Sequence, residues 1–264
     1  MTDLTALLRH DRAVVVSSLV LTTIFAWAYL LLGAGMNMAA MKPGDMATPG
    51  MPMAMSGWTI GHAALVFVMW AVMMVAMMLP SAAPTILLVA ALARQRIGSD
   101  AGGLAAGAAG LFASGYLLVW VAFSLIATTL QWGLTEAGVL SPVVAMTDRG
   151  LAAGVLIAAG IYQWTPLKAA CLRNCGSPLN ILVNHWRPDR LGPLRVGLLI
   201  GFYCLGCCWV LMALLFVGGI MNLLWIAGLS LLVLIEKTLP WGGWTARVAG
   251  AVLASWGSAT LVML

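Results

Sequence analysis

Seven long apolar stretches, separated by short polar or glycine- and proline-rich segments, constrain what this chain can fold into. They cover residues 13–33, 58–93, 104–130, 150–167, 196–217, 222–239 and 246–264. Hydrophobic residues make up 62% of the 264-residue chain and charged residues only 8%, whereas soluble proteins carry about 25% charged residues. Because about 20 apolar residues suffice for one helical crossing of a bilayer, the sequence predicts an all-α polytopic membrane bundle. We expect about seven transmembrane helices forming a single membrane domain over residues 1–264.

The basic residues fall almost entirely on one side of this topology. Of the 13 lysines and arginines, two (Lys42 and Arg149) lie on one side and all the others on the opposite side. The larger group is Arg9, Arg12, Arg94, Arg96, Lys168, Arg173, Arg187, Arg190, Arg195, Lys237 and Arg247. Because basic loops stay in the cytoplasm, we expect a cytoplasmic N-terminus and an external C-terminus. The first apolar stretch lacks the exit of a cleavable signal peptide and is expected to remain as a span.

Three of the five cysteines lie in the apolar stretch 196–217. On a helix, Cys204, Cys208 and Met212 share one face at i, i+4 and i+8, with Cys207 on the edge of that face. Thiolates and thioethers are soft ligands that suit Cu(I), and thiolates also suit zinc and iron–sulfur centres. The alternative is that these side chains only fill space in the core.

A segment with unusually many methionines lies on the predicted external side. Residues 34–57 hold seven of the 17 methionines, interleaved with glycine and proline. The group Met51, Met53 and Met55 places thioethers at every second position of a chain able to wrap one soft ion. We therefore expect 34–57 to be an external methionine-rich loop that captures Cu(I), the alternative being an apolar flap on the bilayer surface.

The next apolar stretch continues this pattern. Met69, Met73 and Met77 recur every four residues, and His62 lies seven residues before Met69, close to the same face. They are expected to form a thioether-lined path inward, unless they only provide a flexible packing face. Further along this stretch two prolines, Pro80 and Pro84, predict a kinked or discontinuous helix.

A second pair of cysteines and a pair of charges lie at predicted cytoplasmic ends of spans. Cys171 and Cys175 are four residues apart at the start of a basic loop expected over 168–195. They are placed to complete the site of Cys204, Cys207 and Cys208, or to receive metal from it. Glu236 and Lys237 are either functional intramembrane charges or a mutual ion pair that caps the end of a helix.

Four sequence blocks resemble a bacterial family of multi-pass membrane proteins described as predicted metal-binding, a domain-of-unknown-function family. They are Trp70-x-x-Met-Met-Val-Ala-Met-Met-Leu-Pro80, Tyr162-Gln-x-x-Pro-Leu-Lys-x-x-Cys-Leu-x-x-Cys175, Tyr203-Cys-Leu-Gly-Cys-Cys-Trp209 with Leu211-Met212, and Glu236-Lys237. The resemblance covers about residue 58 to the C-terminus. It implies a metal site in the bacterial inner membrane and supplies no reaction.

The remaining function classes are weighed against metal handling. No basic stripe interleaved with aromatics indicates nucleic-acid binding, and the spans offer few of the His or carboxylate ligands of a zinc hydrolase. Thiol–disulfide or electron-transfer chemistry at the cysteines is the main alternative, and a structural assembly subunit the second. The sequence favours binding, transport or delivery of a soft metal, most plainly Cu(I), over an enzyme. Its expected partners are the lipid bilayer, the metal ion and a periplasmic or membrane metal-delivery protein.

Overall fold

The computed structural model describes residues 2–33, 58–97, 102–140, 146–185, 189 and 191–263. These ranges form helices, with one isolated bridge between Leu140 and Met146. The helices are α1 (Thr2–Leu31), α2 (Ile60–Ile97), α3 (Gly102–Glu136), α4 (Arg149–Gln163), α5 (Pro166–Gly176), α6 (Leu179–His185), α7 (Gly192–Ala213), α8 (Leu215–Gly218), α9 (Leu223–Thr238) and α10 (Gly242–Val262). The predicted all-α fold class is confirmed for the described part of the chain.

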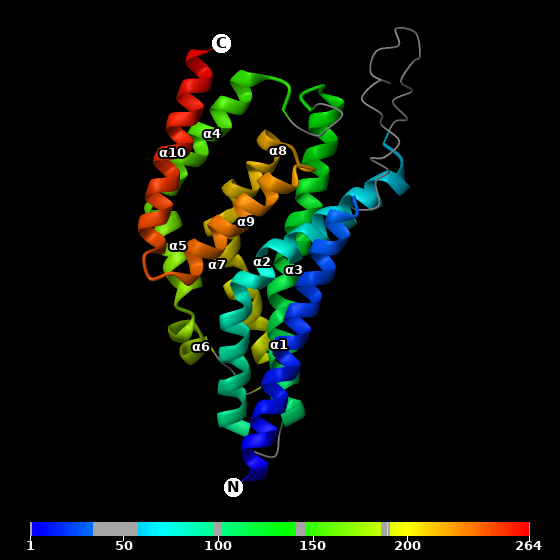
Figure 1. The fold of residues 1–264 in the computed structure, drawn as a ribbon, viewed down its shortest axis with the longest axis vertical. Coiled ribbons are helices and arrows are strands. Elements are labelled where there is room, and N and C mark those ends of the chain that lie inside the picture. The colour runs from blue at the N-terminus through cyan, green and yellow to red at the C-terminus, as the bar shows by residue number, and fades with distance from the viewer. Residues whose placement is uncertain are drawn as a thin grey trace.

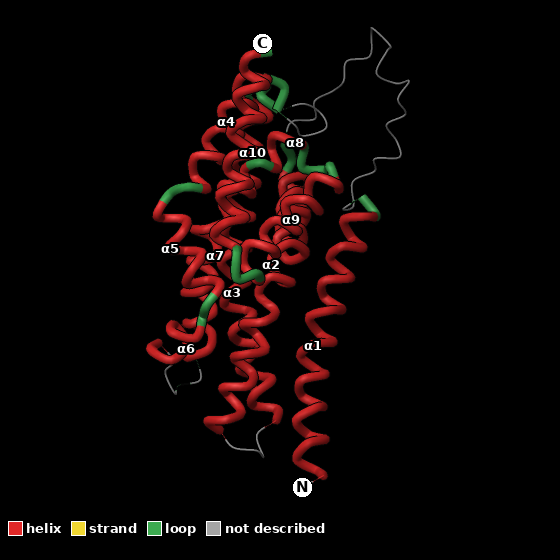
Figure 2. Tube along the Cα trace, turned by 60° about the vertical axis from the view of Figure 1, so that its left-hand side comes forward, coloured by secondary structure: helices red, strands yellow, loops and turns green. Residues whose placement is uncertain are grey.

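The helices form two groups that meet along α5 and α9. One group contains α1, α2, α3 and α7, with α3 packed along α7 and α2 along α3. The other is the pair α4 and α10, which run side by side (Figures 1 and 2). Helices α5 and α9 each contact α7 and each other, so they lie between the groups. The two chain ends lie at opposite ends of the molecule (Figure 1).

Helix α2 continues across both of its prolines but is bent. Figure 1 shows its first half sloping across the bundle and its second half following the long axis. Pro80 has no N–H, so the carbonyl of Ala76, four residues earlier, has no helical donor. The indole Nε1 of Trp27 on α1 donates to that carbonyl at 3.2 Å. The predicted kink is therefore present, and a side chain from a neighbouring helix satisfies the freed backbone group.

Glycines allow two helix pairs to approach closely. A Cβ at Gly197 on α7 would collide with the backbone oxygen of Phe112 on α3. A Cβ at Gly160 on α4 would lie 2.7 Å from the backbone oxygen of Gly250 on α10. Any residue other than glycine at these positions would therefore push the helices apart. Small residues allow the same close approach in other apolar helix bundles.

Within the described ranges, four segments are long and apolar enough to cross a membrane as helices. They are Ala13–Leu31, Ile60–Gln95, Ala105–Glu136 and Gly192–Gly218, the last of which joins α7 and α8. A fifth crossing is present if α4 and α5, which meet at a bend of 64°, count as one broken span. The prediction of seven crossings with a cytoplasmic N-terminus remains a prediction, because α9 has only 16 residues and α10 does not reach the same apolarity.

Two predicted segments differ from those in the structure. The span expected over 150–167 ends at Gln163, because Thr165 caps a new helix through its side chain and Pro166 occupies the first turn of α5. Most of the basic segment 168–195, expected to be a loop, lies in α5, α6 and the start of α7. The methionine-rich segment 34–57 lies outside the described residues.

Candidate metal site

The sulfur face predicted on α7 is buried in the centre of the bundle. The side chains of Cys204, Cys207, Cys208 and Met212 are each at most 1% exposed. The Sγ atoms of Cys207 and Cys208 lie 3.3 Å apart, and the Cys207 thiol donates to the backbone oxygen of Cys204 at 3.1 Å. All five cysteines of the chain are free thiols. Met212 continues the same face one turn beyond Cys208.

Helix α5 adds one of its two cysteines to this group. The thiol of Cys175 interacts with those of Cys204 and Cys207. We call Cys175, Cys204, Cys207 and Cys208 the thiol cluster. Cys171 instead lies against Gly206 on another side of α7, where a Cβ on that glycine would be 2.8 Å from the Cys171 sulfur. Of the two cysteines expected to face the site from this helix, Cys175 does so and Cys171 does not.

A buried lysine from α9 reaches the centre of the thiol cluster. Lys237 donates from Nζ to the Sγ of Cys204 at 2.8 Å and to the Oγ of Ser81 at 3.2 Å. Its Nζ also lies 3.8 Å from the Sδ of Met78. The hydroxyl of Tyr116 on α3 approaches the same Cys204 sulfur to 2.9 Å. Cys204 thus contacts polar groups from α3 and α9, and Lys237 joins the cluster to the bent part of α2.

The second charged residue on α9 points to a different partner. Glu236 accepts from Nζ of Lys168 at 2.7 Å, and both side chains are 1% exposed. The amide of Gln163 donates to the other oxygen of the carboxylate at 3.3 Å. The alternative in which Glu236 and Lys237 pair with each other is therefore wrong. The two neighbours thus bind different helices, Glu236 the α4–α5 junction and Lys237 α7 and α2.

The methionines of α2 are buried, and the histidine before them is not. Met69, Met73 and Met77 are each at most 1% exposed. His62 is exposed at the start of α2, where its ring lies 4.9 Å from that of Trp58. Met51, Met53 and Met55 lie outside the described residues. The methionine whose sulfur lies near the lysine of the site is Met78, one position after Met77 and outside the series Met69, Met73 and Met77.

Two residues that contact the thiol cluster or its lysine, Tyr116 and Ser81, are not expected from the sequence. Neither stands out, because each occurs inside an apolar stretch at no diagnostic spacing. Met78, which also contacts the lysine, lies within the block Trp70–Pro80, four residues after Met74. A lysine in an apolar helix is a detectable signal, and of the two alternatives for Lys237 the contact with Cys204 fits the intramembrane charge and not the pair with Glu236.

The chemistry of the cluster is that of soft donors in an apolar setting. Within the described ranges, no three His, Cys, Asp or Glu side chains are placed as they stand to ligate one ion together. Two thiolates bound to one ion at about 2.3 Å each are about 3.8 Å apart at a tetrahedral angle and about 4.6 Å apart in a linear arrangement, more than the 3.3 Å between Cys207 and Cys208. Metal binding at this pair therefore requires small rotations of the thiols, whereas the donor set itself suits Cu(I).

Fold and site together define an all-helical protein of long apolar helices around a buried sulfur-rich site. A family model described as PpoB2, copper chaperone, matches residues 67–260, and the chain belongs to that family. The match spans α2 to α10 and so includes the whole thiol cluster. It supports copper as the associated metal and confirms the metal-related part of the sequence resemblance. No curated protein and no solved structure matches the chain.

Proposed function

We propose that this protein holds Cu(I) in the thiol cluster, inside a membrane, and passes it to or from another carrier. The observation that carries the proposal is the convergence of Cys175 from α5 with Cys204, Cys207 and Cys208 from α7 around a buried lysine. Membership of a copper chaperone family supports copper as the metal. Soft thiolates select Cu(I) over hard cations.

The buried lysine fits a monovalent cargo. Cu(I) held by two thiolates carries one net negative charge, which is costly in an apolar interior without a counter-charge. An ammonium at Lys237, 2.8 Å from the Cys204 sulfur, supplies that counter-charge. Binding replaces thiol protons by metal, so affinity should fall as the pH is lowered.

The membrane setting is supported by the outer surface of the helices. Large apolar side chains point outward from the described helices, including Phe25 at 70% exposed and Leu224 at 87%. Exposure of many large apolar side chains is expected of helices that contact an apolar phase. The opposite positions of the two chain ends are consistent with an odd number of crossings (Figure 1). In this proposal the methionine-rich segment 34–57 captures copper externally, and Met69, Met73 and Met77 lead toward the cluster.

Thiol–disulfide exchange is less well supported by the geometry. Such exchange needs a sulfur that a partner can reach, and three of the four cluster thiols are at most 1% exposed. The most exposed cysteine, Cys171, lies against Gly206, away from the others.

The direct experiment is anaerobic Cu(I) titration of the detergent-purified protein against a coloured Cu(I) chelator, with metal counting after desalting. We expect the wild type to retain Cu(I) tightly, C204S/C207S/C208S to lose tight binding while remaining folded, and C171S to bind as the wild type does. Retention of copper by the triple variant, or loss of copper by C171S, would contradict the assignment of the site.

A further inference from the structure

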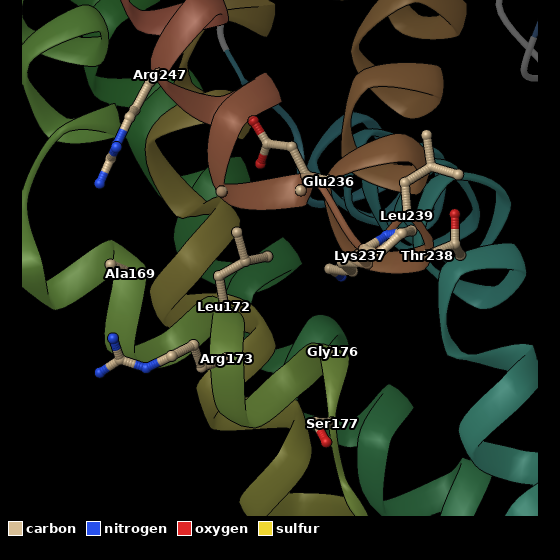
Figure 3. A pocket seen from close by; sticks show the side chains of 13 residues that line it. Ala169, Leu172, Arg173, Gly176, Ser177, Glu236, Lys237, Thr238, Leu239 and Arg247 are labelled. Carbon is tan, nitrogen blue, oxygen red and sulfur yellow. The ribbon is translucent and has the colours of Figure 1, made fainter.

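A hollow opens between α5, the end of α9 and the start of α10. Its volume is about 630 Å³, within the range of small-molecule pockets. In the view of Figure 3, Arg173 and Arg247 extend to one side of it and Lys237 lies on the other. We call it the α5–α9 pocket. It is large enough for a small peptide or a metal complex and too small for a protein domain.

The charge around the α5–α9 pocket is positive. Arg173 and Arg247 are exposed at its rim, and no acidic side chain in the described ranges forms an ion pair with either. The carboxylate in the wall, Glu236, is already bound by Lys168. The pocket therefore favours an anion.

The α5–α9 pocket adjoins the thiol cluster. A second cavity of about 180 Å³ shares Gly176, Lys237 and Thr238 with it and is also lined by Cys175. Cys175 is 8% exposed, whereas the other three cluster thiols are at most 1% exposed. A ligand in the pocket thus lies beside Lys237, and the cluster thiol that it reaches through the adjoining cavity is Cys175.

We propose that the α5–α9 pocket binds the copper carrier itself, a small anionic thiol complex of Cu(I), and that Cys175 is the first thiol to exchange with it. This rests on the proposed function and names the form in which the cargo arrives or leaves. In the exchange, one Cu–S bond to the carrier breaks as one Cu–S bond to Cys175 forms. The proton of the Cys175 thiol passes to the released carrier thiolate, and copper stays Cu(I). The arginines bind the negative groups of the carrier.

The test compares two copper donors on the purified protein under anaerobic conditions. One donor is the Cu(I) complex of glutathione, a tripeptide thiol that bears carboxylates, and the other is the Cu(I) complex of dithiothreitol, a dithiol without carboxylates. We expect R173Q/R247Q to load about tenfold more slowly from the glutathione complex, the loss of about one charge-assisted hydrogen bond. R173K/R247K should recover most of the rate. Loading from the dithiothreitol complex should be unchanged in every variant.

The matched control is R195Q, because Arg195 is an exposed arginine outside the pocket, paired with Asp189 at 3.0 Å. It should load from both donors as the wild type does. S-methylglutathione, which is anionic but cannot hold copper through a thiol, should slow loading of the wild type and not of R173Q/R247Q. Equal loading of the wild type and R173Q/R247Q from the glutathione complex would overturn the proposal.

Three further outcomes separate the sources of failure. If phosphatidylglycerol vesicles slow loading and S-methylglutathione does not, the pocket holds a lipid headgroup and the carrier proposal is wrong. If the wild type loads from neither donor, the copper-binding function fails, and this proposal with it. If R173Q/R247Q slows loading from both donors equally, the pocket proposal is wrong and the copper-binding function still stands.

Discussion

Lys237 on α9 donates to the sulfur of Cys204 on α7 at 2.8 Å, in a position where neither side chain is more than 8% exposed. These residues are 33 positions apart in the chain, and their contact joins the charged end of α9 to the centre of the thiol cluster. A buried ammonium beside a thiol stabilises the negative charge that a thiolate–metal complex carries.

Replacing this lysine should therefore weaken copper binding without unfolding the protein. We expect K237M to lower Cu(I) affinity by about tenfold to a hundredfold, the range for losing one hydrogen bond to a charged group. The measurement is competition with a Cu(I) chelator. K237R keeps the positive charge and has room in the adjoining cavity of about 180 Å³, so it should retain most of the affinity. Equal affinities for K237M and the wild type would show that Lys237 is only structural.

The buried pair Lys168 and Glu236 should dominate local stability. Removing one partner leaves an uncompensated buried charge, which typically costs about 3–5 kcal/mol. We expect K168M and E236Q each to lower the apparent Tm in detergent strongly, and K168M/E236Q to lower it by less than their sum. The control is the pair Arg195 and Asp189, with side chains 54% and 46% exposed. D189N should change stability by less than about 1 kcal/mol. Additive effects of K168M and E236Q would contradict the pairing.

The distribution of basic residues predicts the orientation of the chain. Reporter fusions should place positions near Gly50 and the C-terminus outside, and positions near Arg187 inside. An internal C-terminus would contradict an odd number of crossings. The short α9, 16 residues or about 24 Å long, is the helix whose crossing the fusions test most sharply.

The methionine-rich segment 34–57 should control the rate of capture and not the final amount of bound copper. Neutral thioethers leave the ion its full charge and bind it less tightly than thiolates do. Replacing its seven methionines by leucine should slow loading at limiting external copper and leave the final stoichiometry unchanged. The measurement needs cells, or vesicles of known membrane orientation, so that copper is added only on the external side. A variant that loads as fast as the wild type would show that the segment has no part in capture.

The sequence predicted the local features of the site and not its long-range contacts. Helical spacing alone placed Cys204, Cys208 and Met212 on one buried face. The approach of Cys175 depends on where α5 begins, which the pair Thr165 and Pro166 signals through capping and the fixed φ of proline. The continuous apolarity of residues 150–167 outweighs that signal in the sequence, which therefore predicts one longer span.

The partners of the charged residues could not be read from spacing. Glu236 and Lys237 are adjacent in the chain, yet about 100° apart around a helix, so they face different neighbours. Their partners Lys168 and Cys204 come from helices α5 and α7, and only the packing of those helices decides the pairing. Tyr116 and Ser81 are likewise placed by the packing of α3 and α2 around the cluster.

X-ray absorption at the copper K-edge of the loaded protein tests the central claim most directly. The account predicts a Cu(I) edge and a first shell of sulfur near the ~2.3 Å typical of metal–thiolate bonds, lost in C204S/C207S/C208S and kept in C171S. A first shell of nitrogen or oxygen near ~2.0 Å, or an unchanged sulfur shell in the triple variant, would contradict copper binding by the thiol cluster.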